Sequence, residues 1–291
     1  MRDFVIMTDS CCDLNAEEVA QSGLCVIPLR FTIGGETYRD TPDHADMQPE
    51  EFYRRLKAGE RSVTAAANVA DFADAMLPIL REGKDILCVA FSSALSTTYQ
   101  SACIAANELR AEFPEAKIVV IDSLCASRGQ GMLVWHAAKE KAKGRGIDEV
   151  ADWVRDHIPH QEHWFTVDDL NHLRRGGRLN ATSAVIGTVL SIKPVMHCDA
   201  EGKLTPVGKA RGMKQALAEL VDRMDELGTA PLSAQTVFIC HAAAPESVDL
   251  VKTMLLQRCG VTDVRADYIG PVIGSHTGAG TLGLFFFGSE R

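Results

Sequence analysis

Residues 85–102 constrain the fold more than any other stretch of the chain. Ile86 to Phe91 is a short, nearly all-apolar run with two β-branched residues, the pattern of a strand buried on both faces. Small hydroxyl residues follow, and Ser101 to Leu109 then carries apolar residues at helical spacing. This order predicts a loop at the carboxyl end of a parallel strand, where N–H groups and the helix dipole favour an anion. We expect an anion to dock at Ser93, although an ordinary capping turn explains the same residues.

Strands and helices alternate over residues 1–160, which predicts a parallel α/β sheet with right-handed crossovers. Three of the expected strands end in hydroxyl or carboxylate clusters, namely Thr8-Asp9-Ser10, Ser92-Ser93 and Asp122-Ser123. Because the carboxyl ends of parallel strands share one edge of the sheet, these clusters converge where such sheets bind ligands. The convergence favours a binding site over a capping turn.

Residues 161–291 predict a second α/β domain, so the expected fold is two α/β domains, 1–160 and 161–291, the first with a mainly parallel sheet. Along the chain we expect one strand over Leu24 to Leu29 and a helix over Ala181 to Ser191. Ala200 to Gly202 should form a turn between two edge strands.

Composition excludes several classes of protein. The net charge is −9 and no basic run occurs, which argues against nucleic-acid binding. The nine cysteines are scattered without a C-x-x-C pair, which fits reduced thiols in a cytoplasmic protein and neither a disulfide framework nor a zinc site. The first ten residues do not form a signal peptide, and the apolar runs are too short for stable membrane insertion.

His276 is the most conspicuous histidine, because Gly274, Gly278 and Gly280 surround it. We expect a loop there, in which the glycines allow close approach of a ligand. Ser93 paired with His276 suggests an acyl hydrolase, but the G-x-S-x-G elbow is missing.

Two arginine positions are further candidates for anion binding. Arg174-Arg175-Gly-Gly-Arg178 fits an anion clamp, an interface patch or a solvated helix end, and the helix-end interpretation is the simplest for Arg174 and Arg175. Arg211, where a strand gives way to a helix, fits either a contact to a bound acid or a surface arginine.

Several motifs in fixed order resemble the DegV family, the bacterial fatty-acid-binding proteins that serve a fatty acid kinase. The motifs are Thr8-Asp-Ser10 with Asp13-Leu14, Ser92-Ser-Ala-Leu-Ser-Thr-Thr-Tyr-Gln-Ser-Ala102, Ile121-Asp-Ser123, Ser127-Arg-Gly-Gln-Gly131, Leu173-Arg-Arg-Gly-Gly-Arg178, Ile192-Lys-Pro194 and Gly270-Pro-Val-Ile-Gly-Ser-His-Thr-Gly278. The sequence departs from the family at Thr64-Ala-Ala-Ala-Asn68, where members commonly carry Thr-Ser-Gln-Pro-Ser, and at Thr97, where they usually carry Gly.

The resemblance implies a long-chain fatty acid in a buried tunnel between the domains, with no catalytic residue, metal or cofactor of the protein's own. A separate ATP-dependent kinase would phosphorylate the bound carboxylate. The ligand-binding residues that the resemblance implies are Thr64, Ser92, Ser93, Arg211, His276 and Thr277. The alternatives are a serine acyl hydrolase that uses Ser93 and His276, and a lipid-sensing regulator without a kinase partner.

Overall fold

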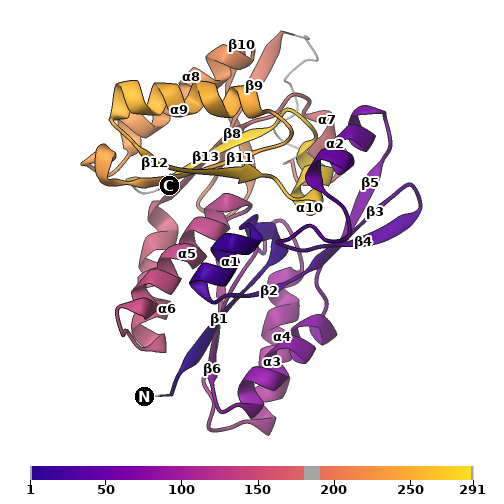
Figure 1. Ribbon diagram of the computed structural model, residues 1–291, viewed down its shortest axis with the longest axis vertical. Helices are drawn as coiled ribbons and strands as arrows, with labels where there is room; N and C mark the ends of the chain where they lie inside the picture. Colours follow the sequence, from indigo (N-terminus) through magenta and orange to yellow (C-terminus); the bar gives the residue numbers. More distant parts are fainter. Residues whose placement is uncertain (1, 180–190, 290) are drawn as a thin grey trace.

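The computed structural model describes residues 2–179, 191–289 and 291, whose strands form three β-sheets (Figure 1). The first sheet has the order β2-β1-β6-β7, and every pair of neighbouring strands in it is parallel, as predicted. Its strands are β1 (Phe4–Asp9), β2 (Cys25–Ile27), β6 (Asp85–Ala90) and β7 (Ile118–Asp122).

Helices cover both faces of this parallel sheet. Figure 1 shows α5 and α6 on one side and α3 and α4 on the other. All six residues of β6 are buried, which explains why the strand reads as a continuous apolar run. The helices of this part are α1 (Ala16–Ser22), α3 (Val69–Arg81), α4 (Thr98–Glu112), α5 (Arg128–Ala142) and α6 (Ile147–His157).

A small antiparallel sheet with the order β4-β3-β5 projects from the first part of the chain. It contains β3 (Leu29–Ile33), β4 (Glu36–Asp40) and β5 (Ser62–Ala65), and α2 (Pro49–Lys57) joins β4 to β5. The single strand expected over residues 24–29 was wrong. Pro28 lies between β2 and β3, and a proline has no N–H to donate to a strand neighbour.

The third sheet has the order β10-β9-β8-β13-β11-β12 and is built from strands after residue 160. Its strands are β8 (Gln161–Thr166), β9 (Ile192–Cys198), β10 (Leu204–Arg211), β11 (Thr236–His241), β12 (Asp263–Tyr268) and β13 (Leu282–Phe287). Helices α8 (Met213–Leu227) and α9 (Pro245–Cys259) cover one face (Figure 1). Of two short helices, α10 (Pro271–Thr277) lies beside the small antiparallel sheet and α2, and α7 (Asn171–Arg175) packs against α10.

The structure differs from one expectation for this region and describes almost none of the residues of another. The turn at residues 200–202 was expected between two edge strands, but only β10 is an edge strand, because β9 also pairs with β8. The helix expected over residues 181–191 lies outside the described residues except for its last position. Among the described residues, none of the helices combines the length and apolar character needed to cross a membrane.

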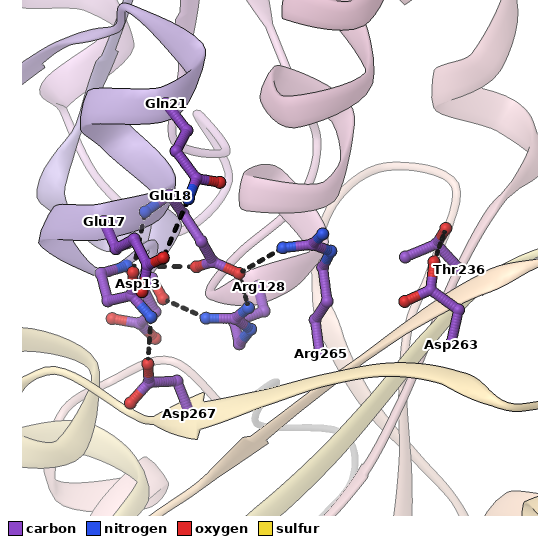
Figure 2. A network of polar contacts seen from close by, with 10 residues as sticks. Asp13, Glu17, Glu18, Gln21, Arg128, Thr236, Asp263, Arg265 and Asp267 are labelled. Carbon is purple, nitrogen blue, oxygen red and sulfur yellow. Dashed lines mark hydrogen bonds and ion pairs between the residues drawn. The ribbon is translucent and has the colours of Figure 1, made fainter.

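The parallel sheet and the six-stranded sheet meet across α5, which contacts β1 and β6 on one side and β8, β11 and β13 on the other. One hydrophobic core runs through this junction, from Met7 to Phe238 and Phe285. A buried polar network lies beside it, in which Glu18 sits between Arg128 and Arg265 (Figure 2). The two parts of the chain therefore share one interior, and a cavity in that interior is lined by both.

Candidate functional site

A mostly apolar cavity opens between the small antiparallel sheet, the loop after β6, and the six-stranded sheet. It encloses about 750 Å³ of empty space when its open mouth is included. Its apolar wall is formed by Leu29, Ala66, Phe91, Leu95, Ala126, Phe165, Leu173, Leu204, Ile269, Val272, Ile273 and Phe285. Its polar lining consists of Thr64, Ser96, Ser127, His163, Arg178, Cys240, His276, Thr277 and Thr281.

Burial separates the open end of this cavity from its closed end. Thr64, Ser96, Arg178 and His276 are half-buried, so they border solvent. At the other end, Phe285 is fully buried at the junction of the sheets. The cavity therefore has an open, polar end and a deep, mainly apolar end, which is the shape that an amphiphile with a single polar head requires.

The open end is formed by β5 and α10. Alternate residues of a strand point to the same face, so Ser62 and Thr64 both face α10. Ser62 Oγ lies 2.7 Å from Ser275 Oγ, and Thr64 Oγ1 lies 2.8 Å from His276 Nε2. β5 was not expected from the sequence, because it is a short edge strand of four residues.

His276 lies in the last turn of a helix and not in a loop, so the expected loop over residues 270–280 was wrong for its first part. Pro271 occupies the first position of α10, where its missing N–H costs nothing and its fixed φ favours a helix. The glycines serve close packing instead. A Cβ at Gly274 would lie 2.4 Å from the Tyr53 hydroxyl.

His276 is neutral at pH 7. Burial, and then the positive charge of Arg178, lower the pKa of its imidazole to about 4. Its Nδ1 has no hydrogen-bond partner among the described residues. That atom is packed against Gly176, where an added Cβ would lie 2.3 Å from it. The ring is thus held between Thr64 and Gly176 beside a cationic side chain.

Arg178 is the member of the predicted arginine cluster that lines the cavity. Its Nε donates to the carbonyl of Leu95 (3.0 Å), and Nη1 donates to the carbonyl of Gly176 (2.5 Å). Arg174 and Arg175 are exposed in the last turn of α7, as the helix-end interpretation expects. A positive charge therefore stands at the cavity mouth, close to His276.

The structure brings some of the other predicted residues to the cavity and leaves others outside it. Thr277 lines the wall, with its hydroxyl donating to the Ile273 carbonyl (3.3 Å). Ser92 is buried and its hydroxyl donates to the Gly202 carbonyl (2.9 Å). Ser93 is half-buried, and Arg211 is exposed at the end of β10. Ser92, Ser93 and Arg211 are not among the lining residues.

The strand-end clusters do converge, and they fix the loop after β6. Phe91 N–H donates to Asp9 Oδ2 (2.8 Å), and Ser93 N–H donates to Asp122 Oδ1 (3.1 Å). This loop places Phe91, Leu95 and Ser96 on the cavity wall. The carboxylates of Asp9 and Asp122 thus already accept from the N–H groups of Phe91 and Ser93. A ligand anion would therefore have to find its hydrogen-bond donors elsewhere on the wall.

Several lining residues escaped the sequence analysis. Ser127 was part of a recognised motif, but nothing indicated that its hydroxyl would bond to Asp13 beside the cavity. His163 lies within β8, and its Nδ1 is buried without a partner among the described residues. A histidine in the middle of a strand carries no sequence signal for a cavity, because only the packing of neighbouring elements creates one.

The geometry bears on serine hydrolysis and on metal binding. Neither ring nitrogen of His276 bonds to Ser93, because Nε2 contacts Thr64 and Nδ1 is unpartnered within the described part of the chain. The described residues also contain no group of three or more His, Cys, Asp or Glu side chains placed to hold a metal ion. The arrangement can bind an amphiphile with an anionic head.

Comparisons with known proteins agree on one family. The family model described as "Uncharacterised protein, DegV family" matches residues 3–289. A DegV domain-containing protein of Clostridium perfringens is 40% identical over 291 residues, covering 100% of this chain and 99% of that protein. A DegV domain-containing protein of Lactococcus lactis is 36% identical, covering 97% and 96%.

Two solved structures resemble the whole chain. A structure described as "Fatty Acid Binding of a DegV family Protein from Thermus thermophilus" is 29% identical, with a TM-score of 0.87 and coverage of 99% and 100%. A lipid-binding protein of the same family from Thermotoga maritima is 28% identical, with a TM-score of 0.85 and coverage of 99% of both chains.

Proposed function

Because the chain belongs to the DegV family, we propose that it binds a long-chain fatty acid in the cavity and presents the carboxylate to a separate ATP-dependent kinase. The observation that carries the proposal is the cavity itself, which has a mostly apolar wall and four half-buried polar side chains, Thr64, Ser96, Arg178 and His276, at its open end. The Thermus thermophilus relative, described as binding fatty acid, supports the same ligand class.

The acyl tail supplies most of the binding free energy. Each methylene that leaves water for an apolar wall contributes about 0.8 kcal/mol. The wall is rich in Leu, Phe and Ile, so a long chain that fills it gains more than the head-group hydrogen bonds contribute. The depth of the cavity therefore sets which chain lengths bind best.

The head group is held at the mouth by Thr64, His276 and Arg178. A carboxylate beside them accepts hydrogen bonds from the Thr64 hydroxyl and the Arg178 guanidinium, worth roughly 1–3 kcal/mol each, while the Nε2–H of His276 donates to the Thr64 oxygen and so orients its hydroxyl. Thr277 extends the same wall deeper into the cavity. Ser92, Ser93 and Arg211 stay predicted ligands, and Ser93 has the best claim of the three because its loop lines the cavity.

A carrier suits this geometry better than an enzyme does. Hydrolysis by Ser93 needs a base within hydrogen-bond reach of its hydroxyl, and the Nε2 of His276 is bonded to Thr64 instead. A carboxylate at an open mouth is accessible to a second protein that carries ATP. The two remaining alternatives, a serine acyl hydrolase and a lipid-sensing regulator without a kinase, make different predictions.

Native mass spectrometry of the freshly purified protein, followed by organic extraction, tests the ligand. We expect one fatty acid per chain. Ala126 is buried in the cavity wall at 6% exposure, so an Ala126→Leu variant places a larger side chain in the cavity. The extracted acids should then shift to shorter chains. Ala65→Leu, on the exposed side of β5, is the matched control. A protein that stays empty and refuses added palmitate would refute the proposal.

The kinase step and the alternatives need separate assays. The protein loaded with fatty acid should yield acyl phosphate when it is mixed with ATP and the host's fatty acid kinase. A mixture with the same amounts of fatty acid, ATP and kinase but without this protein should not. Labelling of Ser93 by a fluorophosphonate probe would favour the hydrolase. Stoichiometric acid with no acyl phosphate from any host kinase would favour the lipid-sensing regulator.

A further inference from the structure

Two buried carboxylates from distant parts of the chain hold the first turn of α10. Gly270 N–H donates to Asp13 Oδ1 (2.9 Å), and Val272 N–H donates to Asp40 Oδ2 (3.0 Å). Asp13 and Asp40 are 8% and 3% exposed. The first N–H groups of a helix have no acceptor within it, so these carboxylates satisfy groups that would otherwise be buried without a partner.

The two carboxylates crowd the same backbone position. A Cβ at Gly270 would lie 2.8 Å from Asp13 Oδ1 and 3.0 Å from Asp40 Oδ2. Their mutual repulsion at this buried position is large unless one of them carries a proton. Burial raises the pKa of Asp13 to about 7, and burial together with the charge of Asp13 raises that of Asp40 well above its usual range.

Further groups face this pair from every side. Asp13 also accepts from the Ser127 hydroxyl, and its main-chain carbonyl accepts from Arg128 (2.9 Å). Of these neighbours only Arg128 adds a positive charge, and it favours ionisation of Asp13 over Asp40. The titratable and charged groups around the pair are Asp9, Cys11, Cys12, His44, Tyr53, Arg128, Cys240, Asp267 and Tyr268.

The anchored turn leads directly to the cavity mouth. Within α10, Gly274 N–H bonds to the Gly270 carbonyl (2.8 Å) and Gly278 N–H to the Gly274 carbonyl (2.8 Å). These bonds link the first turn of the helix to its last turn, so a shift at Gly270 would be carried to His276. Such a shift would strain the contacts of α10 with β5, namely Ser275 Oγ to Ser62 Oγ (2.7 Å) and His276 Nε2 to Thr64 Oγ1 (2.8 Å).

We propose that Asp13 and Asp40 are positioning residues for the cavity, whose carboxylates anchor the first turn of α10 and so set where His276 meets Thr64. One consequence is a dependence on pH. When both carboxyls are ionised, the two charges repel beside Gly270 and the anchor loosens. Fatty-acid affinity then falls as pH rises into the range where Asp40 ionises as well as Asp13. This consequence rests on the proposed function, whereas the position of His276 in the ligand-free protein does not.

The test measures palmitate affinity of delipidated protein between pH 6.5 and 8.5, where palmitate stays ionised. Asp40→Ala removes the acceptor for Val272 and should weaken binding about tenfold at pH 7, the equivalent of one hydrogen bond. Asp40→Asn keeps an oxygen acceptor and cannot ionise, so it should restore binding and abolish the loss of affinity at high pH. Asp85→Asn is the matched control, because buried Asp85 accepts the Lys117 N–H (2.9 Å) far from α10.

A second measurement follows the His276 ring by NMR in the ligand-free protein, with His276→Gln to assign its signals. In the wild type the signals should shift as pH rises and Asp40 ionises, and in Asp40→Asn this shift should be absent. If Asp40→Ala fails to fold, the Asp40→Asn comparison decides alone. Identical pH profiles in wild type and Asp40→Asn would overturn the inference. A wild type that binds no palmitate would overturn the proposed function. The NMR comparison would still decide whether Asp13 and Asp40 position His276.

Discussion

The hydroxyl of Thr64 lies 2.8 Å from Nε2 of His276, although 212 positions separate the two residues in the chain. Thr64 comes from an edge strand of the small antiparallel sheet, and His276 from a helix that precedes a central strand of the six-stranded sheet. The bond therefore joins the two parts of the chain at the mouth of the cavity. A ligand carboxylate placed there either displaces this hydrogen bond or adds a further hydrogen bond to it.

Replacing Thr64 tests the head-group assignment. Thr64→Val keeps the shape of the side chain and removes the hydroxyl, so palmitate affinity should fall ten- to a hundredfold, as expected for a hydrogen bond to a charged group. Calorimetric titration of delipidated protein measures the change. Thr37→Val, on the exposed face of the β3–β4 hairpin, should leave affinity unchanged. Equal affinity of Thr64→Val and wild type would remove Thr64 from the site.

Replacing Gly176 tests the position of the His276 ring without mutating Thr64 or His276. The Cβ of Gly176→Ala would lie 2.3 Å from His276 Nδ1, so the ring must move and the bond to Thr64 must lengthen. We expect a loss of palmitate affinity comparable to that of Thr64→Val. Gly177→Ala meets no atom within 4 Å but has a φ of 70°, so it should lower stability and spare binding. The opposite pattern would contradict the assigned position of the ring.

Arg128 tests the polar network beside the cavity (Figure 2). Its guanidinium is 1% exposed and lies 2.6 Å from Glu18. Arg128→Met leaves that buried carboxylate with the cation of Arg265 at 3.6 Å and the N–H of Asn15 at 3.2 Å, and we expect the free energy of unfolding to fall by about 3–5 kcal/mol. Adding Glu18→Gln removes the unpaired charge and keeps the helix cap, so the double variant should be the more stable of the two. Denaturation in urea measures both.

The exposed pair of Arg155 and Asp152 provides the comparison for this prediction. Arg155→Ala should change the free energy of unfolding by less than about 1 kcal/mol, because water already solvates both charges. If Arg128→Met were as mild as Arg155→Ala, the network would not hold the two parts of the chain together.

Asp9 gives the protein a pH-dependent stability of predictable sign. Burial raises the pKa of this carboxyl to about 6, whereas an unfolded chain has a value near 3.9. Between these values the folded protein binds the proton more tightly, so this group's contribution to stability falls as pH rises, by on the order of 2–3 kcal/mol. Histidines with lowered pKa contribute in the opposite direction, and a variant isolates Asp9 from them.

Urea unfolding of wild type and Asp9→Asn at pH 4.5, 5.5 and 6.5 measures this contribution. The stability of the variant relative to wild type should improve steadily across the series, because the amide side chain that replaces the carboxyl does not titrate. A constant difference at all three pH values would mean that Asp9 is ionised throughout.

Local sequence patterns predicted most of the individual elements. Apolar residues at helical spacing run through 69–81 and 213–227, the ranges of α3 and α8, because capping residues and apolar spacing act within a few residues. The parallel sheet followed from the alternation of buried strands and helices. Strand β5 and helix α10 were missed. One is a four-residue edge strand, and the glycines of the other made it resemble a loop.

The sequence by itself determined the fold class, the family and the set of polar residues at the strand ends, since these depend on local order along the chain. Only the tertiary structure decided which of those residues face the cavity. It placed Thr64, His276 and Arg178 at one mouth and used Asp9, Ser92 and Asp122 to fix the neighbouring loop. The physical reason is that a cavity is the space left between packed elements. Its lining depends on how strands and helices from distant parts of the chain meet, and no short segment carries that information.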